Sequence, residues 1–150
     1  MKKKRLHYDV TKCVACRTCE LVCFVGHSLS KDIFEAISEK KIHLPKVKVF
    51  QDKGKNFPVA CRHCDDPKCV DACIARALTY DLEKKEVIHD KDKCVGCWMC
   101  IMVCPYGAIR PDKRVKIPTR CDHCVEIGQP QCAKNCPTKA ISYEEEEGVK

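Results

Sequence analysis

Residues 94 to 105, CVGCWMCIMVCP, place four cysteines within eleven positions and close the run with a proline. Three thiols spaced C-x2-C-x2-C can surround an object wider than a single ion, and a cubane iron–sulfur cluster is such an object because each iron needs one thiolate. Structural zinc more often uses two C-x2-C pairs that are well separated in the sequence. The run therefore predicts a [4Fe-4S] cluster, with zinc and disulfides as the alternatives.

Cysteine accounts for 16 of the 150 residues, which is far above ordinary usage. A small secreted disulfide scaffold could explain this number, but the basic start MKKKRLHYDVTK is not followed by the apolar run of a signal peptide. No stretch approaches the roughly 20 apolar residues that span a bilayer. We therefore expect a cytoplasmic protein without a membrane span. Because mean hydropathy is −0.35 and 6% of residues are aromatic, we expect metal ligation to hold a thin core together.

The cysteines form four quartets with none left over. The first and third have the same compact spacing, whereas the second and fourth each contain one longer gap, of four and seven residues. In chain order the quartets are Cys13, Cys16, Cys19 and Cys23; Cys61, Cys64, Cys69 and Cys73; Cys94, Cys97, Cys100 and Cys104; and Cys121, Cys124, Cys132 and Cys136.

The quartets belong to a longer internal repeat. LHYDVTKCVACRTCELVC (6–23) aligns without a gap to VIHDKDKCVGCWMCIMVC (87–104), and FPVACRHC (57–64) aligns to IPTRCDHC (117–124). The halves differ in the spacer between their quartets, since Cys23 to Cys61 is 38 positions and Cys104 to Cys121 is 17. A tandem duplication with about 21 extra residues in its first half explains this pattern.

Short elements are predicted between the quartets. Ser30 is a plausible N-cap for a helix that runs to about Lys40, and residues 47–49 alternate as in a strand. Residues 78–80 and 87–89 predict a β-hairpin. The predicted helix that ends near Lys40 would have one apolar face, formed by Ile33, Phe34, Ala36 and Ile37. We expect the acidic tail YEEEEGVK to be mobile.

Residues 94–105 have the spacing C-x2-C-x2-C-x3-C-P, which is the cysteine run of bacterial ferredoxins. This run also predicts how the quartets pair, because its fourth cysteine ligates the other cluster of the pair. The second and third quartets are separated by 20 residues that contain the predicted hairpin, so we expect them to exchange fourth ligands. The first and fourth quartets are then left to each other. The predicted ligand sets are Cys13, Cys16, Cys19 and Cys136 (set 1); Cys61, Cys64, Cys69 and Cys104 (set 2); Cys94, Cys97, Cys100 and Cys73 (set 3); and Cys121, Cys124, Cys132 and Cys23 (set 4).

Pairing of the first quartet with the second is the alternative, and it would have to span the 37 residues between Cys23 and Cys61. With crossed pairing, residues 1–150 form one α+β domain, a pseudo-twofold pair of bacterial dicluster-ferredoxin-like units with one nested in the other. The inner unit covers residues 57–109, and the outer unit covers 6–23 plus 117–142. Residues 24–56 form a helical and strand insert.

The formal charge of +7 would ordinarily suggest a nucleic-acid partner. Four oxidised clusters with their thiolates carry about −8, which brings the total to roughly −1, so we expect no nucleic-acid binding. His63 and His123 could be ligands, but each quartet already has four cysteines, so we expect them to hydrogen-bond or pack near sulfur. Trp98 is expected to shield a cluster. No nucleophile–base constellation or nucleotide motif occurs, which predicts an electron-transfer protein rather than an enzyme.

Four quartets in this order, with CRHC opening the second and CDHC opening the fourth, resemble the four-cluster ferredoxin-like electron-transfer subunits. These subunits accompany molybdopterin oxidoreductases, formate hydrogenlyase and related hydrogenases. The resemblance covers about residues 6–142 and implies the crossed ligation described above. Some relatives replace one cysteine of the third quartet, so the presence of Cys97 implies four [4Fe-4S] clusters.

Within that family, the short length and the segment CFVGHSLSKDIFEAI (23–37) look most like the ferredoxin-like subunit of anaerobic carbon monoxide dehydrogenases. This likeness implies a one-electron carrier between carbon monoxide dehydrogenase and a hydrogenase or reductase. One alternative is an iron–sulfur subunit of a molybdenum or tungsten oxidoreductase, such as a formate or aldehyde enzyme, or of a formate hydrogenlyase-type complex. The other is a zinc-stapled interaction module.

Overall fold

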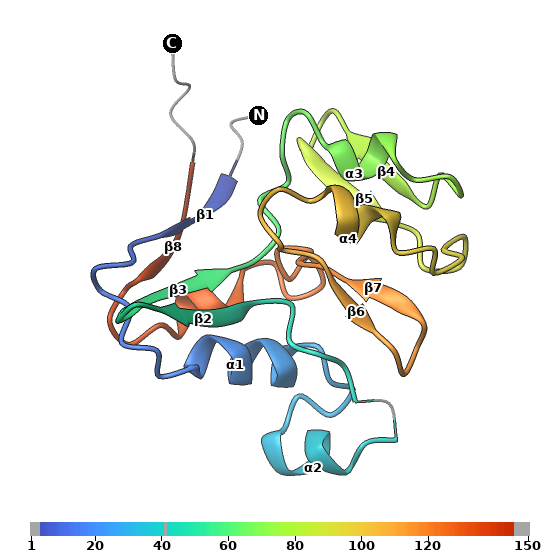
Figure 1. Ribbon diagram of the computed structural model, residues 1–150. Coiled ribbons are helices and arrows are strands. Elements are labelled where there is room, and N and C mark those ends of the chain that lie inside the picture. Colours follow the sequence, from blue (N-terminus) through green and yellow to red (C-terminus); the bar gives the residue numbers. More distant parts are fainter. Residues whose placement is uncertain (1–3, 41, 146–150) are drawn as a thin grey trace.

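The computed structural model describes residues 4–40 and 42–145, and short helices and two-stranded sheets make up its regular structure (Figure 1). Among these residues, no helix has the length and apolar character needed to cross a membrane. The strands are β1 (Lys4–Tyr8), β2 (Lys48–Asp52), β3 (Lys55–Val59), β4 (Leu78–Asp81), β5 (Glu86–His89), β6 (Arg110–Asp112), β7 (Ile117–Thr119) and β8 (Ile141–Glu145). The helices are α1 (Thr18–Gly26), α2 (Ile33–Ser38), α3 (Lys68–Asp71), α4 (Met99–Val103) and α5 (Gln131–Lys134).

The strand pairs reflect the internal repeat. β4 and β5 form the predicted hairpin, with Leu78 opposite His89. β1 and β8 come from the two ends of the chain and pair antiparallel, with Tyr8 opposite Ile141. β1 precedes the first quartet as β5 precedes the third, and β8 follows the fourth quartet as β4 follows the second. The outer pair therefore repeats the inner hairpin with its two strands drawn from distant parts of the sequence.

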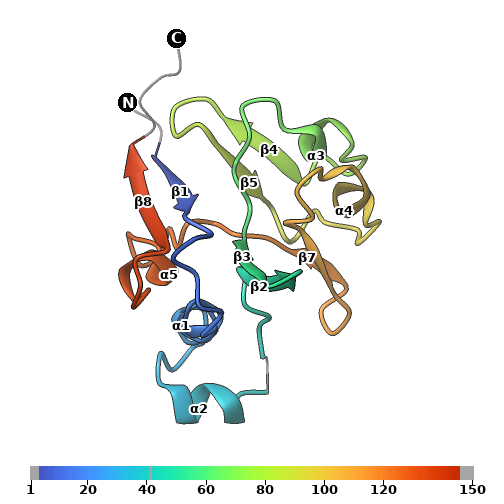
Figure 2. The ribbon, with the colours of Figure 1, turned by 60° about the vertical axis from the view of Figure 1, so that its left-hand side comes forward.

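The helices follow the same relation. α1 contacts α5, and α3 contacts α4, so each compact quartet's helix meets the helix of a looser quartet. Figure 1 shows β4, β5, α3 and α4 together at the upper right, while β1, β8, α1 and α5 lie to the left and centre. The same grouping is visible after rotation in Figure 2. The predicted α+β class is confirmed.

The hydrophobic core consists of two clusters, and cysteines are prominent in both. The larger cluster joins Leu6, Val47, Val49, Ala140 and Ile141 to six buried cysteines. The smaller one joins Leu78, Val87 and Ile109 to Cys100. Cys61 belongs to the larger cluster although it opens the second quartet, so the two groups of elements meet at this residue.

The insert differs from its prediction in detail. Helix α2 is only six residues long, and its N-cap is Asp32, whose carboxylate accepts hydrogen bonds from the Phe34 and Glu35 amides, so the assignment of the cap to Ser30 was wrong. Ser30 instead donates its hydroxyl to Glu39 at 2.8 Å. Of the expected apolar face, Ala36 is fully buried, while Phe34 remains 80% exposed.

The strand predicted near residues 47–49 is present, whereas the prediction for the acidic tail was wrong in part. Residues 48–52 form β2, in which Val49 is buried, as the alternating pattern predicted. The acidic tail was expected to be mobile from Tyr143 onward, but residues 143–145 belong to β8 and pair with β1, so that part of the prediction was wrong. The rest of the tail, residues 146–150, lies outside the described residues.

Glu20 ties α1 to the insert's strand. Its carboxylate accepts a hydrogen bond from the Val49 amide at 2.8 Å and lies 3.1 Å from the Lys48 ammonium. We predict that Glu20→Ala lowers the free energy of unfolding by about 1–3 kcal/mol, because it leaves the Val49 amide without a partner. Thermal unfolding followed anaerobically by circular dichroism measures the change. Lys48→Ala is the control and should cost about 1 kcal/mol or less; equal losses in both variants would contradict the assignment.

Candidate metal centres

All sixteen thiols are free, and two of the predicted sets each line a single cavity. One cavity is lined by Cys13, Cys16, Cys19 and Cys136, together with apolar side chains that include Val49 and Ile141. The other is lined by Cys73, Cys94, Cys97 and Cys100, with Leu78 and Trp98. In both cases the fourth cysteine comes from a different quartet, as crossed pairing requires.

The thiols of set 4 also converge. Cys121 lies close enough to Cys132 and Cys23 for their charges to add to the effect of burial, which raises the pKa of Cys121 well above its ordinary value. Burial and the neighbouring charge of Cys23 likewise raise the pKa of Cys124. Since Cys23 lies on α1, the set joins the first quartet to the fourth.

In set 2 the link runs from the second quartet to the third. Burial chiefly raises the pKa of Cys69 to about 11, and the charges of Cys61 and Cys104 contribute. The pKa of Cys64 is raised by burial and by the same two neighbours. Cys104 follows α4 directly, so this helix delivers a thiol to the group that the second quartet begins.

The backbone of the compact quartets explains how three thiols turn toward one point. Ala15 and Arg17 have positive φ values of 54° and 58°, and Gly96 and Trp98, their counterparts in the repeat, have 66° and 65°. Left-handed residues between successive cysteines curl the loop before the helix begins. Gly96 is required for a second reason, because a Cβ there would lie 2.2 Å from the Lys116 carbonyl oxygen.

The donor chemistry fits iron–sulfur ligation. Burial is the main cause that raises the pKa of Cys19 and Cys132 to about 12 and that of Cys100 to about 11. Such thiols stay protonated near neutral pH unless a bound metal stabilises the thiolate. Convergent groups of four thiols in apolar surroundings are the ligand sets that [4Fe-4S] clusters require.

Polar residues that the sequence did not single out surround Cys23. Its sulfur accepts a hydrogen bond from the Lys46 amide at 3.2 Å. Burial alone would lower the pKa of His27, but Asp122 and Cys23 raise it to about 9. Burial would raise the pKa of Asp122, yet His27 and Lys46 hold it well below its ordinary range. These contacts join α1, the insert and the fourth quartet, and no local sequence signal marks them.

The two histidines of the C-x-H-C segments pack against each other, with ring centroids 4.0 Å apart. His63 is hydrogen-bonded through Nε2 to the Cys121 carbonyl oxygen and through Nδ1 to the Val87 amide. His123 contacts Glu86 through Nδ1 at 2.7 Å. Both rings therefore lie where the inner hairpin meets the fourth quartet.

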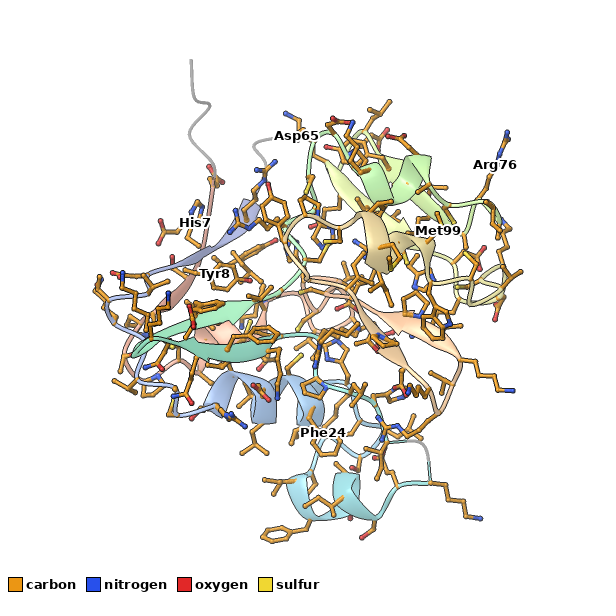
Figure 3. All side chains as sticks on the ribbon, in the orientation of Figure 1. His7, Tyr8, Phe24, Asp65, Arg76 and Met99 are labelled. Carbon is orange, nitrogen blue, oxygen red and sulfur yellow. The ribbon has the colours of Figure 1, made fainter. Side chains whose placement is uncertain are left out.

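Half-buried Tyr8 packs against the core cluster that contains Cys61 and Cys121. Figure 3 shows it extending inward from β1. Burial and the charges of Cys121 and Cys132 raise the pKa of Tyr8 far above its usual value, and Cys61 adds to the effect. An aromatic side chain thus lies close to thiols of both set 4 and set 2.

This combination of a short α+β fold and four groups of convergent thiols defines an iron–sulfur electron-transfer protein that binds four [4Fe-4S] clusters. The chain belongs to the 4Fe-4S dicluster domain family, whose model matches residues 53–146. Zinc stapling and a disulfide scaffold are thereby set aside as accounts of the cysteines.

Curated relatives match along most of the chain. The putative electron transport protein YsaA of Escherichia coli (strain K12) is 33% identical, over 94% of this chain and 89% of its own length. The probable anaerobic dimethyl sulfoxide reductase chain YnfG of the same strain is 32% identical, over 90% of this chain and 70% of its own length. The names describe an electron-transport protein and a reductase chain, in keeping with the expectation that this chain transfers electrons rather than catalysing a reaction.

A solved structure supports the fold. A chain in the active site complex BamBC of benzoyl coenzyme A reductase, as isolated, matches with a TM-score of 0.55 at 22% identity. The match covers 100% of this chain and 83% of that one. At this level of identity the likeness establishes the shared fold and nothing further.

The crossed ligation can be tested with matched serine variants. Cys13→Ser and Cys136→Ser should alter the same one of four reduction steps in a redox titration followed by electron paramagnetic resonance, because both thiols would ligate one cluster. Each variant should lose at most about four of roughly sixteen irons per chain. Cys23→Ser is the control and should alter a different step. If Cys23→Ser and Cys13→Ser altered the same step, the ligation would be uncrossed.

Proposed function

We propose that the protein relays single electrons along the four ligand sets in the order set 1, set 4, set 2, set 3. Each [4Fe-4S] cluster would supply one-electron redox chemistry. The polypeptide would hold the clusters, bury half of their sixteen ligands and leave access at the two ends.

The electrostatic influence of thiols on those of neighbouring sets supports this order. In three places, a thiol of one set lies near enough to a thiol of the next for its charge to raise the pKa of its neighbour. The pairs are Cys132 with Cys19, Cys121 with Cys61, and Cys69 with Cys100. They link set 4 to set 1, set 4 to set 2, and set 2 to set 3.

The observation that carries the proposal is the exposure of the two ends. Cys16 in set 1 and Cys97 in set 3 are exposed, whereas all four thiols of set 4 are buried. Beside them, Val14 and Val95, which are equivalent in the repeat, are 63% and 68% exposed. A series with a fully buried set in its middle and an exposed thiol in each end set suits transfer between two partners.

For the partners, we propose carbon monoxide dehydrogenase as donor and a hydrogenase or reductase as acceptor. The support is the resemblance of residues 23–37 to the ferredoxin-like subunit of anaerobic carbon monoxide dehydrogenases. In the structure this segment forms the end of α1, the following turn and most of α2. It leaves Leu29 and Phe34 more than three-quarters exposed, which suits a partner contact.

The alternative is a tightly bound subunit of a molybdenum or tungsten oxidoreductase, which the likeness to the dimethyl sulfoxide reductase chain favours. Anaerobic purification from the native cell, followed by size-exclusion chromatography, separates the two proposals. A carrier elutes near its own 17.1 kDa, whereas a subunit elutes with a large catalytic chain.

The donor can be tested directly with purified components. In a sealed anaerobic cuvette, carbon monoxide and a catalytic amount of carbon monoxide dehydrogenase should bleach the visible absorbance of the protein. Phe34→Ser removes an exposed apolar group from the proposed contact and should slow bleaching severalfold. Reduction of the same variant by dithionite is the control and should be unchanged. Bleaching by dithionite but not by carbon monoxide and the dehydrogenase would exclude this donor.

A further inference from the structure

A buried arginine lies at the junction between set 2 and set 4. Arg120 directly precedes Cys121 and is only 6% exposed. Its Nη1 donates to the Val87 carbonyl oxygen at 2.9 Å, and its Nη2 donates to the Cys61 sulfur at 3.3 Å. The guanidinium therefore reaches across from the fourth quartet to a thiol that opens the second.

The internal repeat shows that this contact is not shared by both halves. Arg120 corresponds to Ala60, the residue that precedes Cys61. Ala60 is buried and carries no polar group that could reach back toward Cys121. The duplicated loops are thus equivalent in backbone position but differ by one buried positive charge.

The charge acts on one set in particular. The sulfur atom to which Arg120 donates belongs to Cys61, a thiol of set 2. Set 4 has different polar neighbours, since the Cys23 sulfur contacts the Lys46 amide and His27. The positive charge of Arg120 therefore lies beside a ligand of set 2, although Arg120 is next to Cys121 of set 4 in the sequence.

We propose that Arg120 raises the reduction potential of the cluster held by set 2, an inference that rests on the proposed ligation of that cluster by Cys61. Uptake of one electron adds one negative charge to the cluster and its thiolates. A buried cation that donates a hydrogen bond to a ligand sulfur stabilises this reduced form more than the oxidised one. Because the side chain is excluded from water, its charge is weakly screened.

As a consequence, an electron in the relay would occupy the cluster of set 2 for a larger share of the time. A raised potential at set 2 makes this interior station easier to reduce than it would be without the arginine. Arg120 is a positioning residue for charge, since it would act through the Cys61 sulfur and would not itself hold the cluster.

The test is an anaerobic redox titration with dithionite, followed by electron paramagnetic resonance, of the whole protein carrying about sixteen irons. Arg120→Gln should lower one of the four midpoint potentials by about 59 mV and leave the other three unchanged. This shift corresponds to a tenfold smaller equilibrium constant for reduction of that cluster by one electron. Arg62→Gln is the matched control. Arg62 adjoins Cys61 but is exposed, with its guanidinium over the Tyr106 ring, so no comparable shift is expected.

Unchanged potentials in Arg120→Gln, or an equal shift of all four, would overturn the inference. An iron content near eight in the parent protein would instead contradict the four-cluster function. Failure of the inference about Arg120 is thus seen in the midpoint potentials, and failure of the proposed function in the iron content. If Arg120→Gln does not retain its iron, pulsed electron paramagnetic resonance of parent protein labelled with ¹⁵N-arginine replaces the titration. A ¹⁵N coupling to a reduced cluster that is lost in Arg120→Lys and kept in Arg62→Gln supports the contact, and its absence from the parent refutes it.

Discussion

The bond between buried thiolate and iron is the interaction on which this fold depends. Cysteines contribute to both core clusters, and the aliphatic residues around them are few. Burial raises the pKa of Cys19, Cys100, Cys121 and Cys132, so packing these free thiols together gives little reason for them to ionise. Metal binding favours the ionised form of these buried thiols because it stabilises the thiolates. It also cross-links segments that hydrogen bonds alone hold weakly.

Crossed ligand sets, as proposed, would also explain why β1 and β8 pair. β1 and β8 pair as β4 and β5 do, yet they are separated by most of the sequence. An exchange of fourth ligands between the first and fourth quartets would draw these strands together. At the junction, His63 contacts the Cys121 carbonyl oxygen while Arg120 contacts the Cys61 sulfur, so the two duplicated loops are linked in both directions.

The spacing of the cysteines predicted [4Fe-4S] clusters, because cluster geometry permits few ways to space the ligands, whereas the ligand sets themselves stay a prediction. The hairpin at residues 78–89 was equally predictable from its local pattern. The cap of α2 was not, since Ser30 and Asp32 are both good caps and the choice depends on the contact of Ser30 with Glu39. The exposure of Phe34 and the contact of Arg120 with Cys61 depend on distant parts of the chain, so no local pattern could indicate them.

Removal of iron from anaerobically prepared protein tests the central claim most directly. Chelation under reducing conditions, followed by far-ultraviolet circular dichroism and limited proteolysis, compares the stripped chain with the loaded one. The account predicts that the stripped chain loses its cooperative thermal transition and is digested throughout, including β1 and β8. A stripped chain that kept a cooperative transition and resisted the protease would contradict it.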